Sequence, residues 1–179
     1  MRLFTATTLN DDIKEYLFKI TEDLRNHTRS GRFTSKENFH ITMNFIGESD
    51  NVEAIKLAMQ EVIKSGGNMF PITIGGFGRF KRRGGDIYWL GIAKEPSLWQ
   101  LQGDMTGELI KAGFAVEERE FKPHITLGRK ITVDHNFQVL NLEEKFQSRK
   151  MDVTKISLMQ SEHINGKLTY TEIFHINLK

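Results

Sequence analysis

The sequence NFHITMNFIG at residues 38–47 and the sequence KPHITLGR at residues 122–129 share the triplet His-Ile-Thr. The triplets begin at His40 and His124, which lie 84 residues apart. Their neighbours are rich in β-branched and aromatic residues, so each triplet is predicted to lie on a β-strand. Because side chains alternate along a strand, His and Thr share one face and the intervening Ile turns to the other. Each strand is therefore expected to present an imidazole and a hydroxyl on one polar face.

The same shift of 84 residues aligns other predicted elements of the chain. The matched pairs are strand 2–9 with strand 86–93, helix 11–26 with helix 95–110, and strand 69–74 with strand 153–158. Both units then follow the order strand, helix, His-strand, variable segment, strand. Identity between the units is low outside the triplets, so the evidence for a repeat is the matching order of elements.

Locally paired strands with few helices predict an α+β fold. We expect two pseudo-symmetric lobes, each an antiparallel sheet with outer helices, around a central cleft. The repeat units would span about residues 1–84 and 85–179 of a single domain, with the terminal strands exchanged between the lobes. A pseudo-two-fold axis would place the two His-Thr pairs on opposite sides of the cleft.

Three local features between these elements also lead to predictions. Ser49 or Asp50 is expected to cap the second helix. The run GGFGRFKRRGG at residues 75–85 is expected to form a loop after a short strand at 70–74. The stretch 130–150 is ambiguous.

Composition excludes several classes of chemistry. The chain has 179 residues, enough for one domain, and 39% of them are hydrophobic, which excludes a disordered chain. It contains no cysteine, which excludes disulfides, thiolate nucleophiles, iron–sulfur clusters and cysteine zinc sites. A formal net charge of +2 argues against a heavily cationic nucleic-acid-binding module but leaves room for a basic patch. Because we find no signal peptide or membrane-spanning stretch, we expect a cytoplasmic protein that does not contact membranes.

Two imidazoles facing each other across a cleft have a specific chemical use. If they lie on opposite sides of a phosphorus atom, one acts as general base and the other as general acid in an in-line displacement. Thr42 and Thr126 would donate hydrogen bonds to the phosphoryl oxygens. Arg129 joins them only if Gly128 permits a bulge, because strict alternation turns Arg129 away from the face of His124. A zinc site is the competing interpretation, but a third ligand at a suitable spacing is missing.

These motifs resemble the two-histidine (2H) phosphoesterase superfamily, and in particular the RNA 2′,3′-cyclic phosphodiesterases once called 2′-5′ RNA ligases (the LigT/ThpR group). The family motif HxTxxFxG is matched by residues 40–47 and the motif HxTxxR by residues 124–129. The resemblance extends to the segments MRLFTATTL, DIYWLGIA and ISLMQSEHINGKLTYTEIFHINL. One departure is Asn44, where members of the family often carry a basic residue.

The resemblance implies a metal-independent enzyme without a cofactor that opens a 2′,3′-cyclic phosphate at an RNA 3′ end and leaves a 2′-phosphate. His40 and His124 would be catalytic, with the assignment of acid and base left open, and Thr42, Thr126 and Arg129 would bind the phosphate. The reverse reaction would form a 2′-5′ linkage. We expect a monomer. The alternatives are a cyclic phosphodiesterase acting on a small nucleotide, and a non-catalytic module that binds RNA ends.

The densest basic run of the chain lies within residues 75–85. Its candidate RNA contacts are Arg79, Phe80, Lys81, Arg82 and Arg83. The cations would contact phosphates while the aromatic ring stacks on a base. The competing interpretation is a solvated hairpin loop. The same run lacks the Lys-Ser/Thr and helix of a P-loop, and no serine of the chain lies in a GxSxG motif.

Overall fold

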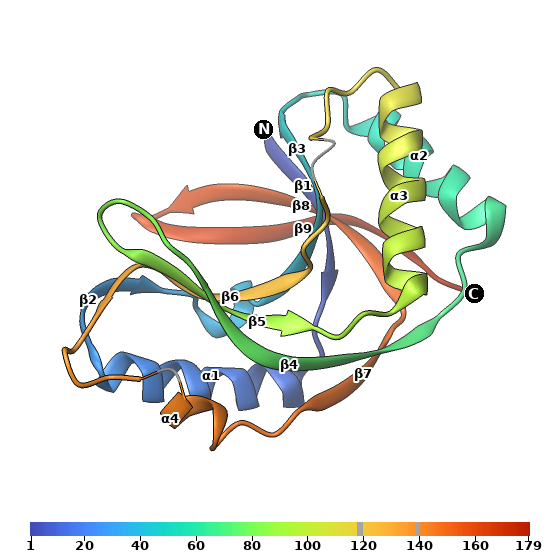
Figure 1. Cartoon of the computed structure of the whole chain (residues 1–179). Coiled ribbons are helices and arrows are strands. Elements are labelled where there is room, and N and C mark those ends of the chain that lie inside the picture. Colours follow the sequence, from blue (N-terminus) through green and yellow to red (C-terminus); the bar gives the residue numbers. More distant parts are fainter. Residues whose placement is uncertain (118–119, 139) are drawn as a thin grey trace.

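Two antiparallel sheets form the frame of the computed structural model, which describes residues 1–117, 120–138 and 140–179 (Figure 1). The four-stranded sheet A has the order β3-β1-β8-β9 and the five-stranded sheet B the order β2-β6-β5-β4-β7. Sheet A comprises β1 (Arg2–Thr8), β3 (His40–Glu48), β8 (Lys155–Ile164) and β9 (Lys167–Asn177). Sheet B comprises β2 (Thr28–Phe33), β4 (Phe70–Phe80), β5 (Asp86–Ile92), β6 (His124–Val133) and β7 (Arg149–Val153). The predicted α+β class is confirmed.

The helices cover the sheets, as the amphipathic patterns predict. They are α1 (Asp11–Asn26), α2 (Val52–Gly66), α3 (Pro96–Lys111) and the single turn α4 (Leu140–Glu143), together with the 3₁₀ turn η1 (Lys36–Asn38). Figure 1 shows α2 and α3 side by side at one end of the molecule and α1 beneath sheet B. The inward face of α1 buries Ile13, Leu17, Ile20 and Leu24. Burying each of these side chains contributes about 1.5–3 kcal/mol, so tertiary packing holds the helix in place.

The chain passes repeatedly between the two sheets. Strand β4, from the first half of the sequence, pairs with β5 and β7 of sheet B, while β8 from the second half pairs with β1 of sheet A. Helix α1 follows a strand of sheet A yet contacts β2 and β6 of sheet B, and α3 follows β5 yet contacts β3. Each sheet therefore contains strands from both halves. We propose that two repeat units, about 1–84 and 85–179, underlie this exchange.

Several local predictions are wrong. Strand β4 continues through Phe80, so only residues 81–85 form the turn of the β4–β5 hairpin. The cap of α2 is Asn51, whose side chain accepts a hydrogen bond from the backbone of Ala54, and not Ser49 or Asp50. The ambiguous stretch contains the end of β6, the turn α4 and the start of β7.

Two hairpin turns project beside each other in Figure 1, at the free ends of β4–β5 and β8–β9. Asn165 and Gly166 both have positive φ, at 51° and 77°, as a two-residue type I′ turn requires. At the other turn, Gly85 lies so close to β6 that a Cβ atom there would come within 2.5 Å of the carbonyl carbon of Lys130. Glycine is therefore required for the β4–β5 hairpin to approach β6.

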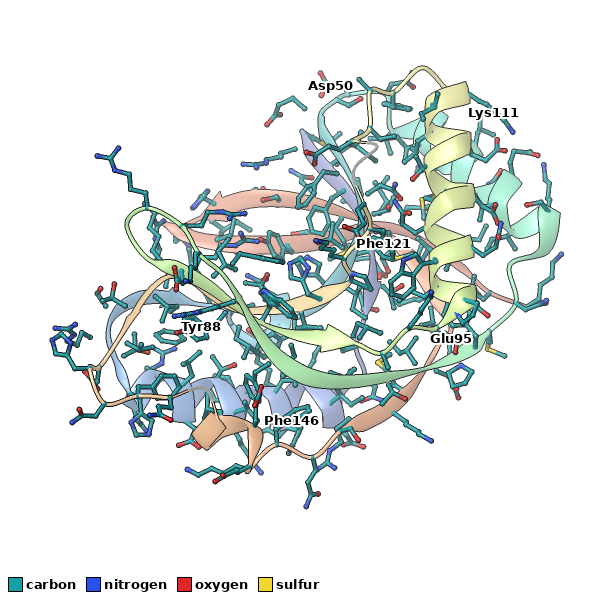
Figure 2. All side chains as sticks on the ribbon, in the orientation of Figure 1. Asp50, Tyr88, Glu95, Lys111, Phe121 and Phe146 are labelled. Carbon is teal, nitrogen blue, oxygen red and sulfur yellow. The ribbon has the colours of Figure 1, made fainter. Side chains whose placement is uncertain are left out.

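The core lies between the sheets and their helices, where side chains fill the space (Figure 2). Tyr88, labelled in Figure 2, is among the largest fully buried side chains and is 1% exposed. No helix of the described ranges is long and apolar enough to span a membrane.

Candidate active site

The two His-strands, β3 and β6, contact each other at the junction of the sheets. On β3, Ile41 and Met43 are buried in the core, and on β6, Ile125 and Leu127 are buried in the same way. The alternate residues line a cleft: Thr42 and His124 face one cavity, and His40 and Thr126 face the adjoining one. The predicted alternation is therefore confirmed on both strands, and the two His-Thr pairs meet in one cleft.

Both catalytic candidates are held by matching hydrogen bonds. Nδ1 of His40 lies 2.7 Å from the carbonyl oxygen of Asn38, and Nδ1 of His124 lies 2.7 Å from the carbonyl oxygen of Lys122. A carbonyl oxygen only accepts, so Nδ1 carries the hydrogen in each ring. In the neutral form, Nε2 then holds the ring lone pair that can accept a proton. Both imidazoles thus use Nε2 as the nitrogen available for proton transfer.

Aromatic rings fix the orientation of each imidazole. The ring of His40 lies 5.0 Å from those of Phe4 and Tyr170, centroid to centroid. The ring of His124 lies 5.2 Å from Phe80 and 5.9 Å from Trp89. Such packing leaves each imidazole little rotational freedom, so it reaches the reacting atoms without first being ordered.

Burial sets the protonation state of His40. The pKa of His40 is lowered from 6.5 to about 4, chiefly by desolvation and also by the positive charges of Arg129 and His124, while the hydrogen bond to the Asn38 carbonyl acts in the opposite direction. His40 is therefore neutral near pH 7. The hydroxyl of Thr42 lies 3.0 Å from Nε2 and donates to it in this neutral state. When Nε2 gains a proton, the direction of this hydrogen bond reverses.

Two bulges in β6 decide where Arg129 points. Trp89 pairs with Thr126 but Tyr88 pairs with Gly128, so Leu127 is skipped. A second irregularity lies between Tyr88 and Asp86. Arg129 consequently lines the cleft on the same side as Thr126, as the conditional prediction from Gly128 required. The position related to Arg129 by the shift of 84 residues is Phe45, an exposed ring in the same cleft.

The cleft consists of two cavities that share Arg129. The first has a volume of about 660 Å³ and is lined by both His-strands, by the aromatic rings of Phe45, Phe80 and Phe121, and by charged residues of both signs. The second, of about 370 Å³, lies on the side of His40 and Tyr170. Both volumes fall in the range that binds small ligands or single nucleotides.

Of the predicted RNA contacts in the basic run, some line the first cavity and the others do not. Phe80 and Arg82 line the first cavity, and the Arg82 guanidinium lies 5.7 Å from the Phe80 ring. Arg79 points instead to Asp86, at 3.4 Å. Lys81 and Arg83 are exposed in the turn and line neither cavity. The part of this run that can reach a ligand is therefore Phe80 and Arg82.

Sequence reasoning missed Asn38, whose side chain joins the segment before His40 to strand β9. Its amide donates to the carbonyl oxygen of Leu168 at 2.9 Å and accepts from the backbone N–H of Tyr170 at 3.2 Å. Only its place two residues before His40 could have drawn attention to it.

Asn44, the departure from the family motif, has a structural role. Its amide donates to Thr106 of α3 at 2.7 Å, and its oxygen lies 3.2 Å from the Thr5 hydroxyl. The side chain is buried, so it links β1, β3 and α3.

Within the residues that the structure describes, no group of three or more His, Asp or Glu side chains could hold a metal ion. The histidines outside the cleft include His175, which pairs with Glu172 at 2.9 Å. The polar groups beside the two His-strands include imidazole, hydroxyl and guanidinium groups, on His40, His124, Thr42, Thr126 and Arg129. These groups suit an anion.

This fold and this pair of imidazoles define a two-histidine phosphoesterase. The sequence model of the 2′-5′ RNA ligase superfamily matches residues 13–165, and the chain belongs to that superfamily.

Relatives and solved structures resemble the chain over most of its length. The RNA 2′,3′-cyclic phosphodiesterase of Thermotoga maritima is 35% identical over 131 residues, which cover 72% of this chain and 70% of that protein. The crystal structure of Escherichia coli LigT without ligand has a TM-score of 0.77 and 26% identity, and covers 99% of this chain and 96% of LigT. LigT in complex with 3′-AMP also has a TM-score of 0.77, covering 99% of this chain and 97% of LigT. The two-lobed α+β architecture is therefore that of LigT.

Proposed function

We propose that this protein hydrolyses 2′,3′-cyclic phosphate ends of RNA to 2′-phosphates by acid–base catalysis between His40 and His124. The observation that carries the proposal is the pair of imidazoles, each held through Nδ1 by a backbone carbonyl and each left with Nε2 for proton transfer. The names of the relatives, RNA 2′,3′-cyclic phosphodiesterases, support the choice of substrate.

The proposed reaction is a single in-line displacement. The neutral imidazole takes a proton from water at Nε2 while the water oxygen bonds to phosphorus. The bond from phosphorus to O3′ breaks, and the protonated imidazole gives its Nε2 proton to O3′. Thr42, Thr126 and Arg129 hold the non-bridging oxygens, where negative charge must be stabilised. If an RNA 5′-hydroxyl takes the place of water in this displacement, the phosphorus stays bonded to O2′ and the product is a 2′-5′ linkage.

Removal of either imidazole tests the mechanism. We expect His40→Ala and His124→Ala each to lower kcat for a nucleoside 2′,3′-cyclic phosphate by at least about a thousandfold, because each variant lacks one proton-transfer group. Circular dichroism checks that both variants stay folded. Wild-type turnover in either folded variant would exclude this mechanism.

A substrate with a modified leaving group shows which histidine is the general acid and which is the general base. A substrate with sulfur in place of O3′ needs no proton on departure, so it restores turnover in the variant that lacks the general acid and not in the one that lacks the general base. Equal failure in both variants would argue against separate acid and base roles.

The products and the metal dependence test the family-based parts of the proposal. We expect turnover to survive EDTA, whereas a loss that zinc reverses would favour the zinc site. Chromatography that separates 2′- from 3′-phosphates should show the 2′ isomer. We also propose that the protein acts as a cytoplasmic monomer, which light scattering and cell fractionation can test.

A further inference from the structure

The second cavity, beside His40, differs in charge from the first. Among the residues that the structure describes, its charged lining is basic and comprises Arg32, Arg129, Lys130 and Lys167, with no Asp or Glu. The first cavity, by contrast, includes Glu117 and Glu120 beside its cations. We refer to the second as the cationic cavity. Concentrated positive charge in a concave site attracts a polyanion.

The cations of this cavity differ in their ion pairing from the lysines on the helices. Among the described residues, Arg32, Lys130 and Lys167 have no carboxylate within salt-bridge distance, whereas Lys64 and Lys111 on the helices each pair with a neighbouring glutamate. An unneutralised cluster on a protein of net charge +2 is not a consequence of overall composition. It leaves the charges of the cationic cavity available for an external anion.

Local backbone geometry places two of these cations on one face. In a regular strand, Arg129 and Lys130 would point to opposite sides. Lys130 instead has a φ of 54°, and both side chains line the cationic cavity. A left-handed conformation at a residue other than glycine costs about 1 kcal/mol, and Gly85 lies close against the backbone of Lys130 at this point. The fold thus keeps the backbone of Lys130 in a strained conformation that places a second cation beside Arg129.

Asn38 connects one wall of the cationic cavity to the catalytic candidate His40. Lys167 begins β9, and Asn38 holds β9 through the backbone of Leu168 and Tyr170. The carbonyl of the same Asn38 accepts the hydrogen bond from Nδ1 of His40. A phosphate held by Lys167 would therefore lie at a fixed offset from the reacting phosphorus.

We propose that the cationic cavity binds the internucleotide phosphodiester immediately 5′ of the terminal nucleotide, through Arg32, Lys130 and Lys167. The aromatic first cavity then receives the terminal base, and Arg129 at the boundary holds the cyclic phosphate. This inference rests on the proposed function and narrows its substrate to oligonucleotides with at least one internal phosphodiester. Phosphate contacts of this kind fix the register of a nucleic acid without reading its sequence.

A comparison of three substrates distinguishes the contribution of this subsite from that of the catalytic site. They are a nucleoside 2′,3′-cyclic phosphate, a dinucleotide that ends in the same cyclic phosphate, and that dinucleotide with an uncharged methylphosphonate linkage. We expect kcat/KM to be roughly tenfold or more higher for the charged dinucleotide than for the other two. Its dependence on salt should also be steeper, by about 0.7 in the log–log slope for each phosphate contacted.

Matched variants locate the effect. Arg32→Ala/Lys167→Ala removes two exposed cations of the cavity, and Lys64→Ala/Lys111→Ala removes two exposed helical cations, the second of which lies at the outer end of α3 (Figure 2). We expect the first pair to lower the ratio of kcat/KM between charged dinucleotide and mononucleotide to near one. The control pair should keep the wild-type ratio.

The outcomes are distinguishable. The subsite would be refuted if the wild type had equal kcat/KM for the charged dinucleotide and the mononucleotide, or if the cavity variant kept the wild-type ratio of these two values. Either result would leave the cyclic phosphodiesterase activity intact. Absence of turnover on every cyclic phosphate would instead refute the proposed function itself.

Discussion

At the scale of single residues, His40 and His124 have the same hydrogen-bonding frame in different surroundings. His40 packs against Phe4 and Tyr170 next to η1, and its Nε2 contacts Thr42. His124 lies at the β4–β5 hairpin, where it contacts Phe80 and Trp89. Matched geometry supplies two equivalent proton-transfer atoms, and the different surroundings allow the two rings to differ in charge.

The depressed pKa of His40 predicts a specific dependence of stability on pH. Its folded-state pKa of about 4 lies below the usual value of ~6.5, so the unfolded chain binds more protons between these two values. We therefore expect this contribution to stability to be complete above about pH 6.5 and to be lost as the pH falls toward 4. Urea denaturation of the wild type and of His40→Gln over this interval measures it.

The variant should show a shallower loss of stability, because its neutral amide does not titrate. An NMR titration of His40 in the free protein, with a midpoint near 4, is the direct check. A midpoint near 6.5, or equal pH dependence in the two proteins, would contradict the prediction.

The residues of the site differ in how far the sequence predicts them. Strand alternation alone places Thr42 and Thr126 beside the imidazoles, because that rule acts between next-nearest neighbours. Arg129 depends on a bulge, which Gly128 permits but does not impose. Asn38 could not be predicted, since its partners on β9 lie 130 and 132 residues away in the sequence. Predictability therefore declines as the contacts that define a role become more distant along the chain.

At the scale of elements, Gly78 of β4 has a packing role. Gly78 pairs with Trp89 across β4 and β5, and a Cβ atom at Gly78 would lie 2.2 Å from the indole ring. The ring covers the strand at that point and also contacts Phe80 and His124. A glycine within a strand commonly marks such a close approach. The strand β4 thus supports His124 through Trp89.

We expect Gly78→Ala to displace Trp89 and to lower kcat by about tenfold or more, because small displacements of a catalytic group are costly. Fluorescence of Trp89 in a Trp99→Phe background should shift at the same time. The control is Gly103→Ala in α3, where a Cβ atom meets nothing within 4 Å.

That control should stabilise the helix by roughly 0.5–1 kcal/mol and leave both the fluorescence and kcat unchanged. If Gly78→Ala behaved like Gly103→Ala, Trp89 would have no part in positioning His124.

The elements that sequence analysis missed are edge strands. Strand β2 reads TRSGRF and β7 reads RKMDV, and neither shows a sustained apolar alternation. Both lie at the edges of sheet B, where one side of the strand is unpaired and solvent is close. The inner strands of sheet B were predicted because burial imposes hydrophobic patterns on them. The edge strands β3 and β9 of sheet A were also predicted, so β2 and β7 escaped prediction because their own sequences lack such a pattern.

At the scale of the whole molecule, the exchange of strands makes the two sequence halves interdependent. In sheet B, β4 pairs only with strands from the second half, and in sheet A, β1 pairs with β8. We expect a fragment of residues 1–84 to lack cooperative folding by circular dichroism and NMR, because β4 then has no partner. Mixing it with a fragment of residues 85–179 should restore the fold and the activity.

A cooperative thermal transition in either isolated fragment would contradict this expectation. The same interdependence means that the two halves of the sequence cannot separate without breaking both sheets.

The central position of β1 in sheet A has a consequence for biosynthesis. Thr5 leaves the ribosome 153 residues ahead of its partner Leu158. At about 5–20 residues per second, roughly 8–30 s pass between them. During this interval β1 has only β3 as a partner, and its other edge is open to association with other chains. Completion of sheet A therefore waits for the synthesis of β8, and a delay in translating the segment before β8 would expose that edge of β1 for longer.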